Sequence, residues 1–145
     1  MKKLFLAAAL FMATLSLTSA KDIDESAKAK AAFSKVFLGV TNAKWKITGE
    51  YIIATFNING SKMKAFYDVD GNLVSTTRVL TSTKELPQNA LDNIQASYPG
   101  WGITELIEES GREAVPAFYA RITDGSRLQI IKIHTSGKIS VFKKE

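Results

Sequence analysis

Apolar side chains recur at helical spacing in two separate stretches of the chain. In the first stretch, steps of three and four residues place five of them on one face, namely Ala29, Phe33, Val36, Phe37 and Val40. Gly39 and Asn42 then interrupt the period. The second stretch, ELPQNALDNIQASYPGW, has Pro87 in its first turn, Pro99-Gly100 at its end and an apolar stripe of Leu91, Ile94 and Tyr98. The pattern predicts two helices.

Period-two alternation follows each predicted helix and is divided by turn signals. The first alternating stretch, residues 44–80, has turn residues at Gly49, Asn59-Gly60 and Asp70-Gly71. The second stretch, residues 102–144, has them at Gly111, Asp124-Gly125 and Ser136-Gly137. Asn-Gly and Asp-Gly between alternating segments favour tight hairpins. The sequence therefore predicts eight strands, four behind each helix.

This order of elements indicates an internal tandem repeat, with copies of about residues 21–82 and 83–145. The central turns of the two copies are alike, since Asn59-Gly60-Ser61-Lys62 corresponds to Asp124-Gly125-Ser126-Arg127. A helix followed by four strands, repeated once, is typical of an α+β protein. We expect one continuous, curved, eight-stranded antiparallel sheet with both helices on one face.

The first 20 residues have the pattern of a signal peptide. Lys2 and Lys3 precede an apolar run over residues 4–17, and Thr18-Ser19-Ala20 supplies the small residues that a signal peptidase requires. The run is too short to span a bilayer, which takes about 20 apolar residues. We therefore expect cleavage after Ala20, a single mature domain of residues 21–145 and a periplasmic or secreted protein that does not span the membrane.

Charge and cysteine content narrow the function classes further. Without Lys2 and Lys3, the 19 basic residues fall to 17 against 14 acidic ones, an ordinary balance for a soluble protein. Together with export, this balance argues against nucleic acid as the partner. The chain has no cysteine, which excludes a thiol nucleophile, a cysteine zinc site and disulfide chemistry.

The stretch FYDVDGNLV raises the question of a calcium loop, because Asp68 and Asp70 lie two residues apart. An EF-hand loop that starts at Asp68 needs glycine at its sixth position and an acid at its twelfth, where this chain has Leu73 and Val79. The corresponding turn of the second copy, residues 135–138, keeps its glycine but has no acid. We interpret both segments as hairpin turns without metal.

Candidate catalytic groups are sparse. His134 is the only histidine, and it lies beside a predicted turn. No nucleophile-elbow or phosphate-binding motif occurs. An acidic cluster around Ser110-Gly111 fits a solvated hairpin end better than paired acid–base carboxylates; its members are Glu105, Glu108, Glu109 and Glu113. We expect no enzymatic activity and no cofactor, with a hydrolase as a distant alternative.

Several short motifs resemble a known family. Trp45 after the first helix, the stretch FYDVDGNLV and the stretch LPQNALDNIQASYPGW are similar to PepSY-like, β-lactamase-inhibitor-protein-like (BLIP-like) domains of exported bacterial proteins. The resemblance implies a helix-backed eight-stranded sheet whose open concave face binds another protein, such as a secreted or periplasmic enzyme. This chain lacks the disulfides of the inhibitor prototype.

Alternation in the first copy also indicates which residues lie on the open face. If Ile52, Ala54 and Phe56 face the helices, the opposite face carries basic side chains around apolar and aromatic ones, namely Lys44, Lys46, Tyr51, Ile53, Lys62, Lys64 and Phe66. We expect Tyr51 and Phe66 to be exposed aromatic anchors within a basic rim, a surface that suits a protein or peptide partner. In the second copy the sequence does not decide which residues face the helices. Alignment of the central turns pairs the apolar Phe56 with the charged Arg121, and a β-bulge would explain this mismatch.

The sequence thus favours an exported protein- or peptide-binding module that uses the open face of its sheet, with an inhibitor-like role as one form of that binding. An accessory cell-envelope protein without inhibitory activity, needed for assembly or lipid handling, is the alternative.

Overall fold

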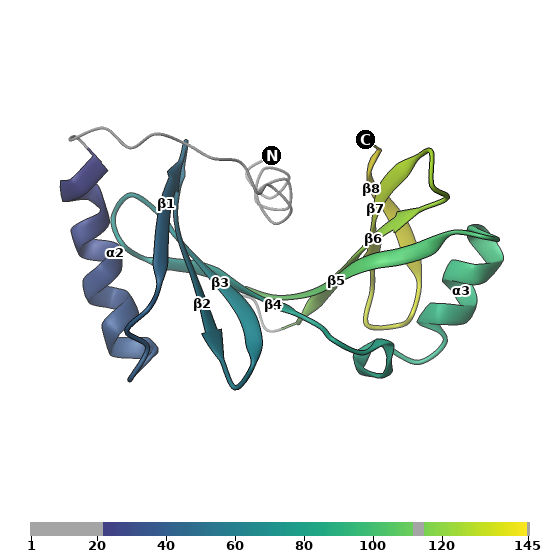
Figure 1. The fold of residues 1–145 in the computed structure, drawn as a ribbon, viewed down its shortest axis with the longest axis horizontal. Helices are drawn as coiled ribbons and strands as arrows, with labels where there is room; N and C mark the ends of the chain where they lie inside the picture. The colour runs from purple at the N-terminus through teal and green to yellow at the C-terminus, as the bar shows by residue number, and fades with distance from the viewer. Residues whose placement is uncertain (1–21, 112–114, 145) are drawn as a thin grey trace.

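The computed structural model describes residues 22–111 and 115–144 (Figure 1). The predicted signal peptide and Glu113 lie outside these residues. The elements follow one another as α2 (Asp22–Val36), β1 (Lys44–Thr48), β2 (Tyr51–Ile58), β3 (Ser61–Tyr67), β4 (Leu73–Val79), the 3-10 helix η1 (Thr83–Glu85), α3 (Ala90–Ser97), β5 (Gly102–Gly111), β6 (Ala117–Thr123), β7 (Leu128–Ile133) and β8 (Ile139–Lys144).

All eight strands belong to one antiparallel sheet in which each strand pairs with its neighbour in sequence, from β1 to β8. Short turns suffice for such a meander, because consecutive antiparallel strands need no crossover. The sheet is open and strongly curved, and α2 and α3 lie at opposite ends on its convex side (Figure 1). The α+β architecture that the sequence predicts is confirmed.

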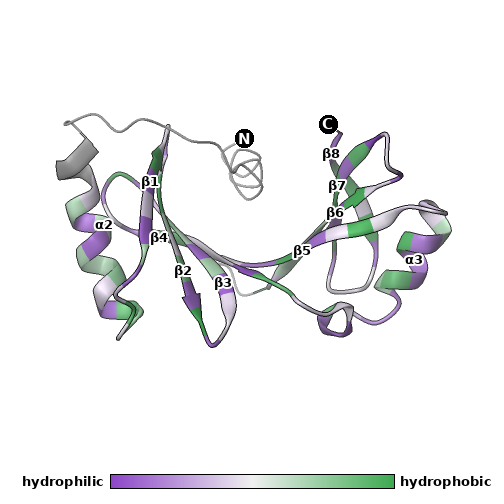
Figure 2. Ribbon diagram, in the orientation of Figure 1, coloured by the Kyte–Doolittle hydropathy of each residue, from purple (hydrophilic) through white to green (hydrophobic). Residues whose placement is uncertain are grey.

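The residues that face the helices form two separate cores. Under α2, Phe33 packs edge-on against Trp45 and Phe56, with ring centroids 5.4 and 4.9 Å apart. Under α3, an aliphatic core gathers side chains from the helix and from β5 to β7, among them Ile94, Leu106, Ile122 and Ile131. Hydrophilic and hydrophobic residues follow one another along the strands, as alternation requires (Figure 2). Val36 departs from its predicted core position, because α2 ends there and its side chain is 57% exposed.

A polar band on the convex face separates these two cores. Its residues come from the middle strands β4 and β5, where Arg78 pairs with Glu108 in the ladder. Nε and Nη2 of Arg78 donate to Glu108 Oε2 at 2.9 and 2.6 Å, and Nη1 donates to Glu85 Oε2 at 2.7 Å. The arginine therefore joins both middle strands to η1, the segment that leads to α3.

The central hairpins of the two halves differ in turn length, which settles the face assignment that alignment leaves open. Asn59 and Gly60 alone connect β2 to β3, and both have positive φ, at 50° and 80°. By contrast, four residues separate Thr123 from Leu128, and β6 pairs with β7 without irregularity. The mismatch between Phe56 and Arg121 therefore arises from the different turn lengths, and the prediction of a β-bulge is wrong for this hairpin. Arg121 consequently lies on the face opposite to that of Phe56.

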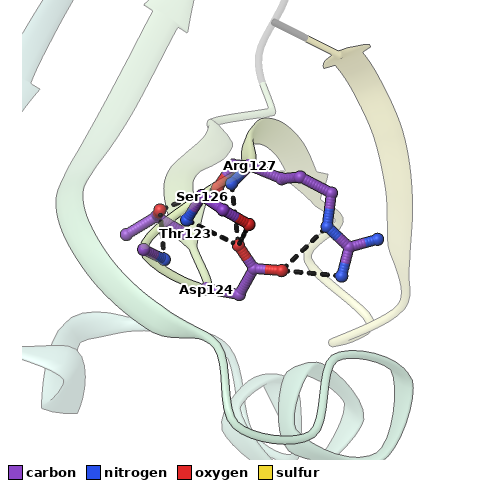
Figure 3. Close-up of polar contacts among 5 residues, drawn as sticks. Thr123, Asp124, Ser126 and Arg127 are labelled. Carbon is purple, nitrogen blue, oxygen red and sulfur yellow. Dashed lines mark hydrogen bonds and ion pairs between the residues drawn. The ribbon is translucent and has the colours of Figure 1, made fainter.

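Asp124 organises the longer turn (Figure 3). Its Oδ1 accepts hydrogen bonds from the backbone N–H groups of Ser126 and Arg127 at 3.0 and 2.7 Å, and its Oδ2 accepts from Arg127 Nε at 2.8 Å. These bonds stabilise the carboxylate, so they hold the pKa of Asp124 well below its usual range. The Arg127 guanidinium lies 5.1 Å from the centre of the Trp101 ring, which joins the turn to the start of β5.

The acidic turn between β3 and β4 docks on α2. Asp68 Oδ1 accepts from the N–H groups of Asp70 and Asn72 at 3.0 and 2.8 Å, so its carboxylate caps the turn itself. Gly71 has φ +82°, and a Cβ at that position would lie 2.7 Å from Lys28 Cβ. In the second half, Gly137 makes a similar close approach to the backbone of Gln88 ahead of α3. Both turns therefore place glycine where a helical segment comes near.

We predict that Gly71→Ala destabilises the fold more than Gly60→Ala. Both residues have positive φ, at +82° and +80°, but nothing lies within 4 Å of a Cβ at Gly60. The backbone strain of alanine should cost each variant about 1–2 kcal/mol. Overlap with α2 should add about 1–3 kcal/mol at Gly71 alone. Urea denaturation measures both losses, and equal losses would contradict the docking of this turn on α2.

We also predict that the turn at residues 68–72 binds no calcium, because its first carboxylate is occupied by the amides of the turn. The melting temperature of the purified protein should be the same in millimolar calcium and in excess chelator, and the double variant Asp68→Asn, Asp70→Asn should share this indifference. A calcium-dependent rise in the wild type that the variant loses would overturn the interpretation.

Candidate binding surface on the open face of the sheet

The strand register places all seven candidate residues on the face that the helices leave uncovered. Lys46, Ile53 and Phe66 form one cross-strand row over β1 to β3. Lys44 and Lys64 lie in the adjacent row, on either side of Thr55. Tyr51 and Lys62 share this face by alternation along β2 and β3. The face is the inner, concave side of the curved sheet (Figure 1).

Burial divides the seven residues into two kinds. Phe66 and Ile53 are 0% and 6% exposed, although neither α2 nor α3 covers their face. They belong to a third core, the concave cluster, which consists of Ile53, Phe66, Ile107, Tyr119 and Ile130. Curvature brings side chains of β2 and β3 against those of β5 to β7. The expectation that Phe66 is an exposed anchor is therefore wrong, whereas Tyr51 is half-buried at the border of the cluster.

Two β-bulges determine which residues of the second half lie on the concave face. In β5 the register shifts between Ile103 and Glu105, so Ile103 packs in the core under α3 while Glu105 lies opposite Arg121 on the concave face. In β8 a second shift leaves Phe142 outside the ladder, and its ring packs edge-on against Tyr119 at 5.3 Å. An inserted residue reverses alternation beyond it and re-aims side chains. The bulges thus add charged and aromatic groups to the concave face.

A basic cluster forms where the two halves meet. We define it as Lys46, Lys62, Lys64 and Arg121. Burial lowers the pKa of Lys64, and the positive charges of Lys62, Lys46 and Arg121 lower it further, while Glu105 acts in the opposite direction. Arg121 Nη1 lies 3.8 Å from Glu105 Oε2. Lys44, at the end of the edge strand β1, is exposed.

The acidic residues of β5 do not form a carboxylate pair. Glu108 points to the convex face and binds Arg78, whereas Glu105 and Glu109 lie on the concave face. Burial raises the pKa of Glu109, against the opposing effects of a hydrogen bond from the Tyr119 hydroxyl and of the Lys132 charge. Burial and the nearby Glu109 carboxylate raise the pKa of Tyr119. The interpretation as a solvated hairpin end is therefore wrong for Glu108 and Glu109.

His134 is exposed, and its Nε2 lies 3.1 Å from Ser140 Oγ on the neighbouring strand. Ser140 is exposed as well, so this pair faces water. Over residues 22–111 and 115–144, no three histidine, cysteine, aspartate or glutamate side chains could hold a metal ion together. In the same part of the chain no helix is long and apolar enough to cross a membrane.

Sequence reasoning missed the second-half residues of this face, namely Glu105, Glu109, Tyr119, Arg121, Lys132 and Phe142. The alternation of AFYARIT contains the signal, because Phe118, Ala120 and Ile122 are apolar and Tyr119 and Arg121 lie between them. Alignment with the first half obscured it, since the turn lengths differ.

Comparison with known proteins identifies the fold. A DUF2874 family protein from Bacteroides uniformis matches with a TM-score of 0.72 at 18% identity, over 78% of this chain and 84% of that one. A predicted periplasmic protein from Bacteroides eggerthii has a TM-score of 0.72 at 16% identity, over 82% and 86% of the two chains. A BLIP-like protein from Bacteroides fragilis has a TM-score of 0.67 at 18% identity, over 90% and 87%.

At this level of identity the matches establish the fold, which is BLIP-like. No protein-family model matches the chain, and no curated protein sequence does. The resemblance to PepSY-like domains stays a prediction.

We predict that Glu109→Gln makes the protein more stable at neutral pH. The folded state raises the pKa of Glu109 above its ordinary value of 4.5, so folding favours the protonated form. The penalty for the partly buried carboxylate is therefore present above the raised pKa and disappears as the pH falls below the ordinary value. Glutamine removes it at every pH.

Thermal melting over a pH series checks this prediction. The gain in melting temperature of Glu109→Gln over the wild type should be largest at neutral pH and vanish in acid. Glu50→Gln, in the exposed turn between β1 and β2, is the control and should give no such profile. A gain that is independent of pH would contradict the burial of the Glu109 carboxylate.

Proposed function

We propose that this chain is an exported protein-binding module, without enzymatic activity, that holds its partner on the concave face of the sheet. The observation that carries the proposal is the composition of that face. A buried apolar cluster forms its floor, half-buried aromatic rings border the floor, and a basic cluster from both halves lies beside it. Protein interfaces combine an apolar centre with aromatic anchors and a polar rim in the same way.

The half-buried rings are the proposed anchors. Tyr51 and Phe142 both pack against the concave cluster, yet each leaves part of its ring accessible. They come from β2 and β8, strands near opposite ends of the sheet order, and the cluster between them draws on β2, β3, β5, β6 and β7. A convex protrusion of a partner would meet both.

The similar solved structures support export and a protein partner. One is described as a predicted periplasmic protein and another as BLIP-like. We propose that the partner is a protein of the cell envelope and that inhibition of a periplasmic or secreted enzyme is one form this binding takes. The PepSY-like relationship and the internal tandem repeat belong to the same proposal. Two glycines support the repeat because they occupy corresponding turns. Gly71 lies close to α2, and Gly137 lies close to the segment that precedes α3.

We predict that a photo-reactive amino acid at position 51 crosslinks one protein stoichiometrically in intact cells. The same group at Lys28, exposed on α2 and remote from the concave face, is the matched control and should not capture that protein. With the purified partner, Tyr51→Ala and Phe142→Ala should each weaken binding by about tenfold or more, the loss expected for anchor residues.

Phe66→Ala serves as the stability control. Because Phe66 is fully buried, its truncation should cost about 3–5 kcal/mol of folding free energy.

The variant Lys62→Glu should mainly slow the association of the protein with its partner. Equal capture from positions 51 and 28, or unchanged affinity in both aromatic variants, would place the binding surface elsewhere.

A further inference from the structure

The C-terminal end of α2 presents two large apolar side chains to solvent. Val36 is 57% exposed and Leu38 is 81% exposed. Between them Phe37 points inward, and its ring centroid lies 4.7 Å from that of Phe56. Gly39, with φ +81°, lets the chain turn away from the helix. This geometry needs Phe37 and Gly39, but polar side chains would suit the two outer positions equally well. The fold itself therefore does not account for the two exposed apolar groups.

The charge around this helix end has one sign. Residues 27–43 contain Lys28, Lys30 and Lys35 and no acidic residue. All three lysines are exposed. Lys30 lies at the flank of the helix, with Nζ 5.8 Å from the centre of the Trp45 ring. Lys28 and Lys35 are about two helical turns apart, so they lie in line along the solvent side. The end of α2 thus combines apolar and cationic groups.

The acidic turn that contacts α2 lies away from this end. The turn at residues 68–72 approaches the middle of the helix, because a Cβ at Gly71 would lie 2.7 Å from Lys28 Cβ. Lys35 is about two turns, or roughly 10 Å, further along the helix axis. Asp68 accepts hydrogen bonds from the amides of its own turn. The negative charge of the turn therefore acts least on Lys35 and on the apolar side chains that follow it.

The position of α2 in the molecule limits what can reach this surface. The helix is the outermost element at one end of the long axis, on the convex side of the sheet (Figure 1). A flat surface can therefore lie against the helix end without entering the concave face. A symmetric contact between two copies of the chain would bring their lysines together, which disfavours a second copy as the occupant. The apolar side chains protrude, and a bilayer accepts protruding side chains without a matching pocket, whereas a protein partner must supply one.

We propose that Lys35, Val36 and Leu38 form a docking surface for a bilayer that contains anionic lipid. Val36 and Leu38 enter the border between headgroups and acyl chains, and Lys35 lies at the level of the lipid phosphates, with Lys28 and Lys30 behind it. Docking of this kind combines apolar insertion with attraction to anionic headgroups. The inference goes beyond the proposed function, because it assigns a second surface on the convex side and leaves the concave face accessible.

A fluorophore that brightens in apolar surroundings tests insertion at one position. The chain has no cysteine, so Leu38→Cys provides a single labelling site. Vesicles of phosphatidylglycerol should raise the fluorescence of the label and shift its emission to shorter wavelength. Vesicles of phosphatidylcholine should have little effect, because they offer the lysines no net negative charge. The same label on Ser97→Cys, exposed at the end of α3, is the matched control and should not respond.

Cosedimentation with the anionic vesicles measures the affinity of unlabelled variants. Leu38→Gln should weaken binding about tenfold, since it removes most of the inserted apolar surface. Lys35→Gln should weaken it about fivefold, the share of one lysine near an anionic surface. Val141→Gln on β8 and Lys84→Gln in η1 are the matched controls and should change nothing. All four side chains are exposed, so the melting temperature should stay the same in each variant.

The variants share one N-terminus with the wild type, so the apolar run at residues 4–17 contributes equally to all of them wherever it is present. Affinity that both Leu38→Gln and Lys35→Gln leave unchanged, equal binding to the two lipids, or a label at position 38 that responds no more than one at position 97 would each overturn the proposal.

Two soluble anions test whether the surface requires a bilayer. Without vesicles, inorganic phosphate and a short glutamate peptide should leave the fluorescence at position 38 unchanged, because neither offers an apolar phase. A response to phosphate as large as that to vesicles would assign the surface to a free anion. An equal response to the peptide would assign it to an acidic protein. Either result would overturn the assignment to lipid.

Discussion

The apolar contact between the two halves on the concave face is the interaction on which the rest of the structure depends. On the convex face, Arg78 and Glu108 separate the core under α2 from the core under α3. The halves therefore meet through the backbone ladder of β4 and β5 and through the concave cluster of Phe66 with residues of β5 to β7. That cluster favours a bent sheet, because bending is what lets side chains two strands apart pack together.

In the proposed function, recognition and stability consequently share the same residues. The apolar centre of a binding face on an open sheet would ordinarily be exposed, but here Phe66 and Ile53 are buried within the protein itself. A partner bound there as proposed would meet a preformed concave floor instead of a flat apolar patch, and the protein by itself avoids a large exposed hydrophobic surface. The accessible aromatic area is left to the border residues Tyr51 and Phe142.

Sequence alternation predicted the first half of this face well and the second half poorly, for reasons that particular residues show. The two-residue turn at Asn59-Gly60 fixes the register of β2 and β3, and β1 pairs with β2 without irregularity, so the candidates from Lys44 to Phe66 lie together on the concave face. In the second half the turn at Asp124 is longer, and bulges interrupt β5 and β8. The bulges reverse the alternation of the two faces, and no residue type in the sequence marks where they occur. The burial of Phe66 depends on sheet curvature, a long-range property that a local pattern does not contain.

The contrast between the two arginines bears on specificity. Arg78 is bound closely by two carboxylates of its own chain, and it ties η1 to the sheet whatever the protein meets. At Arg121 the internal carboxylate is more distant, and Lys64 beside it is partly desolvated among like charges. If the concave face holds a partner as proposed, the partly buried Lys64 among like charges makes a neutral or basic partner surface costly there and an acidic one less so. The basic cluster would then discriminate between partners, which the apolar floor alone would not do.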